Sequence, residues 1–369
     1  MTLKTGKWLL AIGLTLNLST AGATIILDTP TTLSVTEVLN DSVTLNNRDA
    51  SLLVGTGGVV QRTRVYTGSV DVTGNGRVIG GILLGGGTSM ARLSDQATIS
   101  GGIGSDFAAN WDDESKSTVK LYLQDRATVT GSINYSGYLR IEDQAMVLGN
   151  VTNVVSGNVR IDMTGGLIAG GVRLGAGNSM ALNLDGGAIL GGFSAVWGNF
   201  DLNMTGGTLD GGLWTGATVN ADISGGRIDD GILIQSEYGS NHLRITGGQF
   251  DTALDNWLLQ FAGTHYETGN ASGLLEIWGG QFGYAGAGQG LMIDDRMDFS
   301  VYGRDLVYSN GWLTGYLMDG SWFSNALTFG SRWQGTFTIH NVPEPETLAL
   351  FLVGLVGMTL ARRNKKNRA

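Results

Sequence analysis

The most regular feature of the chain is a short motif of glycine and apolar residues that recurs between residues 76 and 283. Each copy places one central apolar residue between glycine turns, as in residues 186–191 (GGAILG). The central residues are Val78, Ile99, Val129, Val147, Ile168, Ile189, Leu209, Ile228, Phe250 and Phe282. Seven of the nine steps between them are 18 to 22 residues long, and a period of that length predicts a stacked repeat array.

Apolar and polar residues alternate on both sides of these glycine turns. Residues 159–163 (VRIDM) and 200–204 (FDLNM) precede a first turn, and residues 231–234 (GILI) follow a second. A period of two places one face of a strand inward and the other outward. We therefore predict an all-β body, a parallel β-solenoid over residues 71–296. Coils stacked about 4.8 Å apart would make ten of them a rod of roughly 45 Å.

Two internal ladders of apolar side chains follow from this register. The first consists of the ten central residues. The second lies on the strand before the first turn and consists of Leu93, Leu123, Ile141, Met163, Leu184, Met204, Ile223, Ile245 and Ile277. The general preference of parallel crossovers predicts a right-handed β-helix. The alternative is an antiparallel sandwich or barrel of short strands, which the regular spacing disfavours.

The segments that flank the repeats lack their period. Residues 297–341 are richer in aromatic residues, and Asn310-Gly311 and Asp319-Gly320 are typical of hairpin turns. We predict an antiparallel β cap there, because an uncovered end coil would expose an edge open to pairing. Residues 24–70 alternate from Thr31 to Leu45 and would cap the other end.

The first 23 residues have the three parts of a secretory signal peptide. Lys4 and Lys7 precede an apolar stretch, and Ala21 and Ala23 mark a small-residue cleavage site. The alternative is an uncleaved membrane anchor, which the shortness of the apolar run disfavours.

The last 28 residues combine a proline motif, an apolar segment and a basic tail. The motif is Val342, Pro343, Glu344 and Pro345, and residues 348–361 are apolar. A helix of that length reaches about 21 Å, short of a hydrocarbon core of about 30 Å. The cluster that begins with Arg362 and Arg363 supplies a positive-inside stop, which predicts a C-terminal transmembrane helix with a cytoplasmic tail.

This order of parts resembles the PEP-CTERM sorting signal of Gram-negative bacteria. The resemblance implies recognition of Pro343, Glu344 and Pro345 by an exosortase, a membrane enzyme that cleaves near this motif. It also implies an inner-membrane-anchored precursor that ends at the cell surface or outside the cell. Proteins with this signal are associated with exopolysaccharide and biofilm production.

The amino-acid composition and net charge exclude some classes of function. The chain has 60 Gly, 3 Pro and no Cys, and residues 31–342 contain no proline, as continuous β-sheet requires. The absence of cysteine excludes disulfides, thiol nucleophiles and Cys-ligated metals. Without the two ends, the body holds 16 Lys and Arg against 30 Asp and Glu, a net charge of about −14. So acidic a body repels phosphate backbones, which argues against nucleic acid as a partner.

Acidic residues in the repeat are the first candidates for chemistry. Asp229 and Asp230 could share a site only in a turn, because adjacent strand residues point to opposite faces; a solvated turn is the simpler interpretation. Asp210, Asp229 and Asp251 occupy one repeat position in three successive coils, where stacked carboxylates repel one another unless a cation or water intervenes. A Ca²⁺ site there is left open, although the nonapeptide motif of calcium-binding β-rolls is absent.

Two stretches lengthen the period and predict projecting loops that combine aromatic and charged residues, as a sugar-binding surface would. The residues concerned are Trp111, Asp112, Asp113, Glu114, Lys116 and Lys120 in the first, and Trp257, His265, Tyr266 and Glu267 in the second. We expect an exported structural or adhesive protein without catalytic residues or cofactor, in contact with exopolysaccharide. The alternative is a polysaccharide lyase or hydrolase on the same scaffold.

Overall fold

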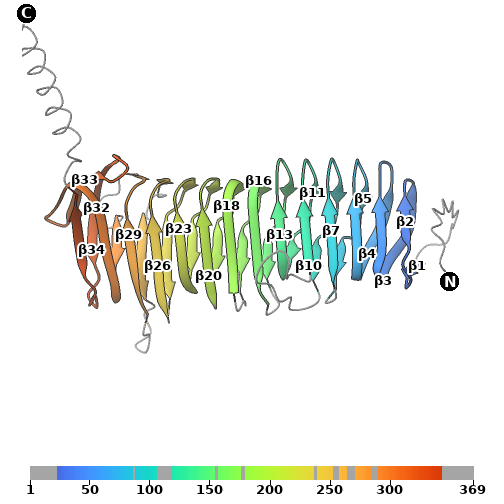
Figure 1. Cartoon of the computed structure of the whole chain (residues 1–369), viewed down its shortest axis with the longest axis horizontal. Helices are drawn as coiled ribbons and strands as arrows, with labels where there is room; N and C mark the ends of the chain where they lie inside the picture. The colour runs from blue at the N-terminus through green and yellow to red at the C-terminus, as the bar shows by residue number, and fades with distance from the viewer. Residues whose placement is uncertain are drawn as a thin grey trace, which may run out of the picture.

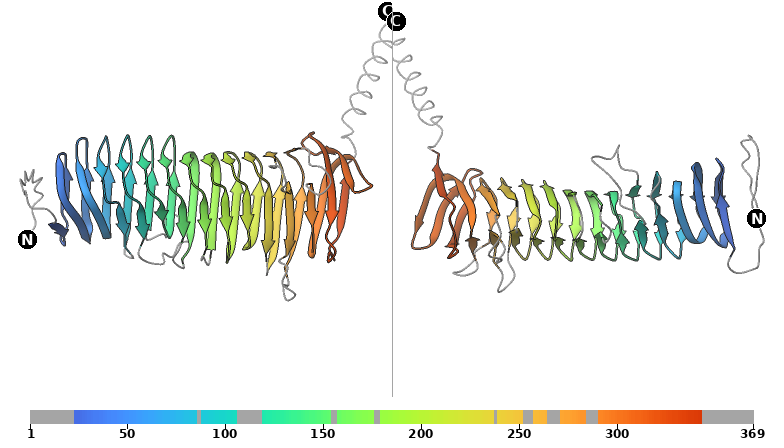
Figure 2. Two further views of the ribbon diagram at one scale, coloured as in Figure 1. Left: turned by 180° about the vertical axis from the view of Figure 1, so that it is seen from behind. Right: turned by 90° about the horizontal axis from the view of Figure 1, so that it is seen from below.

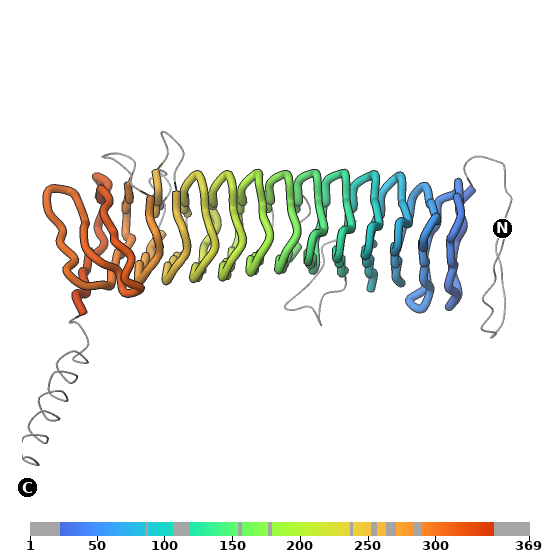
Figure 3. Tube along the Cα trace, turned by 90° about the horizontal axis from the view of Figure 1, so that it is seen from above, coloured from blue at the N-terminus to red at the C-terminus, as the bar shows by residue number. Residues whose placement is uncertain are grey.

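The body of the protein is a long stack of β-coils. The computed structural model describes residues 23–85, 88–105, 119–153, 157–175, 179–236, 239–251, 257–263, 271–283 and 290–342. These residues form 35 β-strands and no helix. The strands wind into a parallel β-solenoid of about 11 turns, in which each coil repeats the path of the one before (Figures 1 and 3).

Each coil contributes to three rows of strands. The first row lies before the first turn and contains β2 (Thr32–Val35), β7 (Ser89–Leu93), β10 (Val119–Leu123), β13 (Gly137–Ile141), β20 (Asn199–Met204), β23 (Thr218–Ile223), β26 (Ser240–Ile245), β29 (Ser272–Ile277), β32 (Arg296–Ser309) and β35 (Phe337–Asn341). The second row lies between the turns and contains β5 (Arg77–Val78), β8 (Thr98–Ile99), β11 (Thr128–Val129), β14 (Met146–Val147), β21 (Thr208–Leu209), β24 (Arg227–Ile228), β27 (Gln249–Phe250) and β30 (Gln281–Phe282).

The third row follows the second turn. It contains β1 (Thr24–Leu27), β6 (Ile82–Leu84), β9 (Ile103–Ser105), β12 (Ile133–Asn134), β15 (Val151–Asn153), β17 (Val172–Leu174), β19 (Phe193–Ala195), β22 (Leu213–Thr215), β25 (Ile232–Ser236), β28 (Leu259–Gly263), β31 (Leu291–Ile293) and β34 (Trp322–Phe329). Four longer strands bend through more than one row: β3 (Val38–Val54), β4 (Val59–Val72), β16 (Val159–Ile168) and β18 (Ser179–Ile189). The remaining strand, β33 (Trp312–Leu317), belongs to a hairpin.

The two predicted ladders are confirmed residue by residue. Every neighbouring pair of the first ladder is in register, from Val78 with Ile99 to Phe250 with Phe282. The second ladder is likewise continuous from Leu93 to Ile277. The pairing is parallel throughout both ladders, which excludes the antiparallel sandwich or barrel.

The register between adjacent coils is also kept across the two long steps of the repeat. Ile99 pairs with Val129 and Phe250 pairs with Phe282, as adjacent coils would without extra residues. The added residues therefore do not interrupt the register of the core. Most of the added residues, 106–118, 252–256 and 264–270, lie outside the described part of the chain.

Glycine is required where the chain turns sharply between rows. Gly187 has φ +82°, and a Cβ atom there would collide with the carbonyl oxygen of Gly165 in the preceding coil. A residue with a side chain would face both strain and a clash at this corner. The glycine pairs thus mark the corners because the coils approach too closely for anything larger.

The N-terminal end continues the solenoid. β1 and β2 both pair with β3 in parallel, and β3 pairs with β4 in parallel. Parallel stacking therefore begins at β1, within the 24–70 segment expected to be a cap, because β3 and β4 each bend through all three rows without the glycine pairs of later coils.

The C-terminal end contains the predicted antiparallel strands. β32, β33 and β34 form consecutive hairpins through turns at Asn310-Gly311, with φ +51° and +79°, and at Gly320, with φ +85°. The same segment also prolongs the solenoid, because β34 pairs in parallel with β31 and β35 with β32. Phe323 from β34 packs edge-on against Phe282 and so covers the last residue of the first ladder. Figure 2 shows this cap at the end opposite β1.

Candidate functional sites

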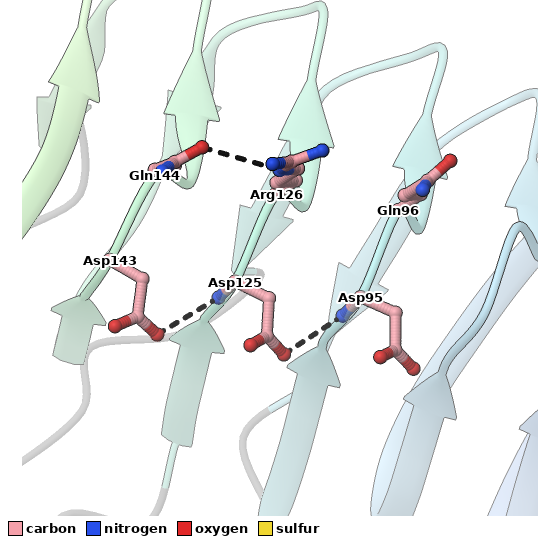
Figure 4. Close-up of a pocket in the computed structure, with 6 residues that line it drawn as sticks. All are labelled: Asp95, Gln96, Asp125, Arg126, Asp143 and Gln144. Carbon is pink, nitrogen blue, oxygen red and sulfur yellow. Dashed lines mark hydrogen bonds between the residues drawn. The ribbon is translucent and has the colours of Figure 1, made fainter.

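A row of aspartates on one edge of the rod lines a shallow hollow of about 390 Å³ (Figure 4). Asp95, Asp125 and Asp143 occupy the same turn in successive coils, each with φ between +55° and +58°. The carboxylate of Asp125 accepts a hydrogen bond from the backbone N–H of Asp95 at 3.0 Å, and that of Asp143 accepts from Asp125 at 3.1 Å. Each carboxylate thus ties its turn to the preceding coil, which is a structural task.

The three stacked aspartates that suggested calcium occupy equivalent positions. The backbone N–H groups of Asp210, Asp229 and Asp251 each donate a hydrogen bond to the carbonyl oxygen of the first-ladder residue in the preceding coil. A guanidinium lies beside two of them: Nε of Arg227 is 2.8 Å from Oδ1 of Asp229, and its terminal nitrogen is 3.6 Å from Oδ2 of Asp251. Arg227 supplies positive charge to this column. Nowhere in the described ranges do three or more His, Cys, Asp or Glu residues gather as a metal site would.

The adjacent residues Asp229 and Asp230 lie in a turn, which agrees with the simpler of the two interpretations, a solvated turn. Asp229 follows β24, and Asp230 adopts φ +68° at the corner before β25. Asp229 faces Arg227, whereas Asp230 lines a different hollow further along the rod. The structure therefore separates the two carboxylates.

Of the charged and aromatic residues predicted in the two loops, only Lys120 and Trp257 lie in the described part of the chain. Lys120 lies on β10, facing outward between Met90 and Tyr138 of neighbouring coils. Trp257 lies in the turn before β28. The rest lie outside the described residues: Trp111, Asp112, Asp113, Glu114, Lys116, His265, Tyr266 and Glu267.

Trp257 belongs to the lining of a groove that crosses three coils. Trp214, which projects outward from the middle of β22, also lines this groove, whose volume is about 280 Å³. Leu233 pairs with Trp214 and Gln260 pairs with Leu233, so these two side chains continue the outward row from Trp214. We call this feature the Trp214–Trp257 groove.

Sequence reasoning found Trp257 but missed Trp214 and Gln260. Trp214 stands one residue after Leu213 in the same strand–turn pattern that places Leu233 after Ile232, which marks both as outward. That signal was present in the repeat. Trp257 follows an irregular stretch of sequence. Its place in the same groove as Trp214 could therefore be found only from the register of the coils.

Two tyrosines have perturbed ionisation. Burial raises the pKa of Tyr135 well above the ordinary value of a tyrosine, since the ring is fully buried; a charge on neighbouring Tyr122 would raise it further. The hydroxyl of Tyr135 donates to the carbonyl oxygens of Val119 and Tyr138, at 2.7 and 2.9 Å, which share its one proton. Desolvation, and next the negative charge of Glu276, raise the pKa of Tyr302. Both groups stay neutral at physiological pH and serve packing.

The end of the body leads directly into the proline motif. β35 pairs in parallel with β32 up to Asn341, and the N–H of Val342 donates to the carbonyl oxygen of Gly303. The side chain of Asn341 makes two hydrogen bonds to the backbone of Leu306, at 2.8 and 3.0 Å. Ordered structure thus extends to the residue before Pro343. Pro343, Glu344, Pro345, Arg362, Arg363 and Ala21 lie outside the described residues, and Ala23 is exposed at their edge.

The described residues form a parallel β-solenoid, and its last strand, β35, ends directly before the proline motif. Residues 341–366 match the family model described as the PEP-CTERM protein-sorting motif. The motif implies an exported, membrane-anchored precursor that is processed by exosortase, a membrane enzyme. No curated protein and no solved structure matches the chain. Within the described part of the chain, no helix has the length and apolar character needed to span a membrane.

Proposed function

We propose that the chain is a non-enzymatic scaffold that exosortase releases to the cell surface or the extracellular matrix, where it has a structural or adhesive role. The observation that carries this proposal is the junction between body and signal. Because β35 is hydrogen-bonded through Asn341, cleavage near Pro343–Pro345 would remove the signal and leave every strand in place. Processing at the motif would therefore not require any described strand of the rod to unfold.

The way the outward side chains pair supports a scaffold role. Nε of Arg160 lies 3.0 Å from Oδ1 of Asp162, which also accepts a hydrogen bond from Asn183 of the next coil at 2.6 Å. Asn220 likewise donates to Asp201, and His242 contacts Glu276 at 2.9 Å. Polar groups on this face join coil to coil, which suits a surface that holds a rod together.

Processing tests the proposal. The double variant P343A/P345A is expressed in a Gram-negative host that carries an exosortase, and membrane and extracellular fractions are compared on blots. We expect wild-type protein to appear outside the inner membrane in a shortened form, and the double variant to accumulate as full-length precursor in that membrane. The matched control is P30A, because Pro30 is the third proline of the chain and lies outside the motif.

Normal processing of P343A/P345A would contradict sorting by this motif. The scaffold role has its own readout in the same cells. The mature protein is expected to be extracted together with extracellular polymers, whereas recovery entirely in the free medium would contradict a role in the matrix.

A further inference from the structure

The Trp214–Trp257 groove carries an inference that rests on the proposed function and extends it. We propose that this groove is a binding site for a neutral polysaccharide, one sugar unit of which packs against its tryptophan side chains. Trp214 belongs to one coil and Trp257 stands two coils further on, with the coil of Leu233 between them. The two backbone positions are therefore about two coil spacings of 4.8 Å apart along the rod, a span that a short stretch of polysaccharide covers.

The two indoles differ from the other aromatic side chains near this end of the rod. Trp278 stacks on Tyr302, Tyr302 stacks on His340, and Trp333 stacks on Phe329, with ring centroids 3.6 to 4.3 Å apart. Across the described ranges, neither Trp214 nor Trp257 contacts another ring or donates an indole hydrogen bond. Trp214 is 39% exposed. Trp257 is partly exposed, so both side chains have surface that a ligand can contact.

The groove combines apolar faces with hydrogen-bonding groups. The Gln260 amide has no hydrogen-bond partner among the described residues, so it can donate to or accept from a hydroxyl. The negative face of an indole attracts the polarised C–H bonds on the flat side of a pyranose, while its N–H can bond to a ring hydroxyl. Such alternation of apolar faces and hydroxyls is the chemistry of a sugar.

Three glycines belong to the lining of the groove. Gly231 has φ +81°, and a Cβ atom there would collide with the carbonyl oxygen of Trp257. Gly211 and Gly212 form the equivalent corner one coil earlier. The close approach of successive coils requires these glycines, and they add no side chain to the lining of the groove.

Charge selects the class of polysaccharide. Among the described residues that line the groove there is no basic side chain, and the body as a whole carries a net charge of about −14. A polymer of uronic acids or phosphates would be repelled. We infer a neutral polymer of hexoses.

Affinity electrophoresis and calorimetry of the purified full chain test this site. The probes are dextran, hydroxyethylcellulose and a neutral glucomannan, with polygalacturonate and a polyproline peptide as comparisons. We expect binding to at least one neutral polymer, weakened about tenfold or more by W214A and by W257A, and partly retained by W214F. W322A is the matched control, because Trp322 is exposed on the cap outside the groove. Thermal unfolding of each variant establishes that it is folded.

Three results would overturn the site: no neutral polymer binds, binding survives W214A and W257A in folded protein, or only polygalacturonate or polyproline binds. None of them would alter processing at Pro343–Pro345. Conversely, normal processing of P343A/P345A would leave glycan binding unchanged. The two proposals therefore fail separately.

Discussion

At the scale of single residues, the turns of the solenoid depend on side chains that tolerate a left-handed backbone. Gly74, Asp95, Asp125 and Asp143 occupy the same turn in four coils, all with φ between +55° and +61°. Aspartate is among the few non-glycine residues suited to this region. It adds an acceptor for the N–H of the preceding coil, which glycine lacks, so one residue type serves both needs.

Replacing Asp125 tests these two contributions together. Asp125→Ala removes the acceptor for the N–H of Asp95 and places Cβ without polar compensation in the left-handed region. We expect a loss of about 1 to 3 kcal/mol in unfolding free energy, measured by urea denaturation. Asp125→Asn keeps an acceptor oxygen and left-handed tolerance, so it should lose less than half as much. Equal losses in the two variants would contradict this assignment.

Tyr135 predicts an alkaline limit to stability. Its pKa in the folded protein lies above that of the unfolded chain, so the unfolded chain loses its proton first as pH rises. Stability from this group is complete below pH 10 and falls as pH increases above 10. Melting temperatures measured from pH 8 to 11.5 should therefore fall more steeply for wild type than for Tyr135→Phe. Parallel curves would contradict a buried, neutral Tyr135.

At the scale of elements, stability resides in the ladders that run through all coils. Ile189 is fully buried between Ile168 and Leu209, whereas the next residue, Leu190, is 42% exposed. Ile189→Asp would place a carboxylate in the apolar interior, and we expect a loss of at least about 3 kcal/mol in unfolding free energy. Leu190→Asp is the matched control and should change it by less than about 0.5 kcal/mol. Equal effects of the two substitutions would refute the register.

Both ladders could be predicted from the sequence because the period that stacks the coils also spaces Ile168, Ile189 and Leu209 along the chain. The coils within residues 24–70 escaped prediction because β3 and β4 turn their corners without glycine pairs. The Arg227 contacts and the Trp214–Trp257 groove depend on side chains from different coils. Such sites can be located only when the register of the coils and the path of the inserted residues are known.

At the scale of the whole molecule, the two ends of the rod differ. The N-terminal coil pairs on one side only, through β1 and β2 with β3, whereas the C-terminal end carries the hairpins and the sorting motif. At the C-terminal end Phe323 packs edge-on against Phe282, so the hairpins cover the last residue of the first ladder. In the sequence, the sorting motif therefore directly follows the end of the acidic rod that carries the hairpins.

The most direct test of the account is the intact mass of the mature protein recovered from outside the inner membrane. Removal of the signal peptide after Ala23 and cleavage beside Pro343–Pro345 predict a product that begins at Thr24, retains β35 and lacks the basic tail from Arg362 onward. A mature product that still carries Arg362 and Arg363, or one cut within the solenoid, would contradict release of an intact rod by exosortase.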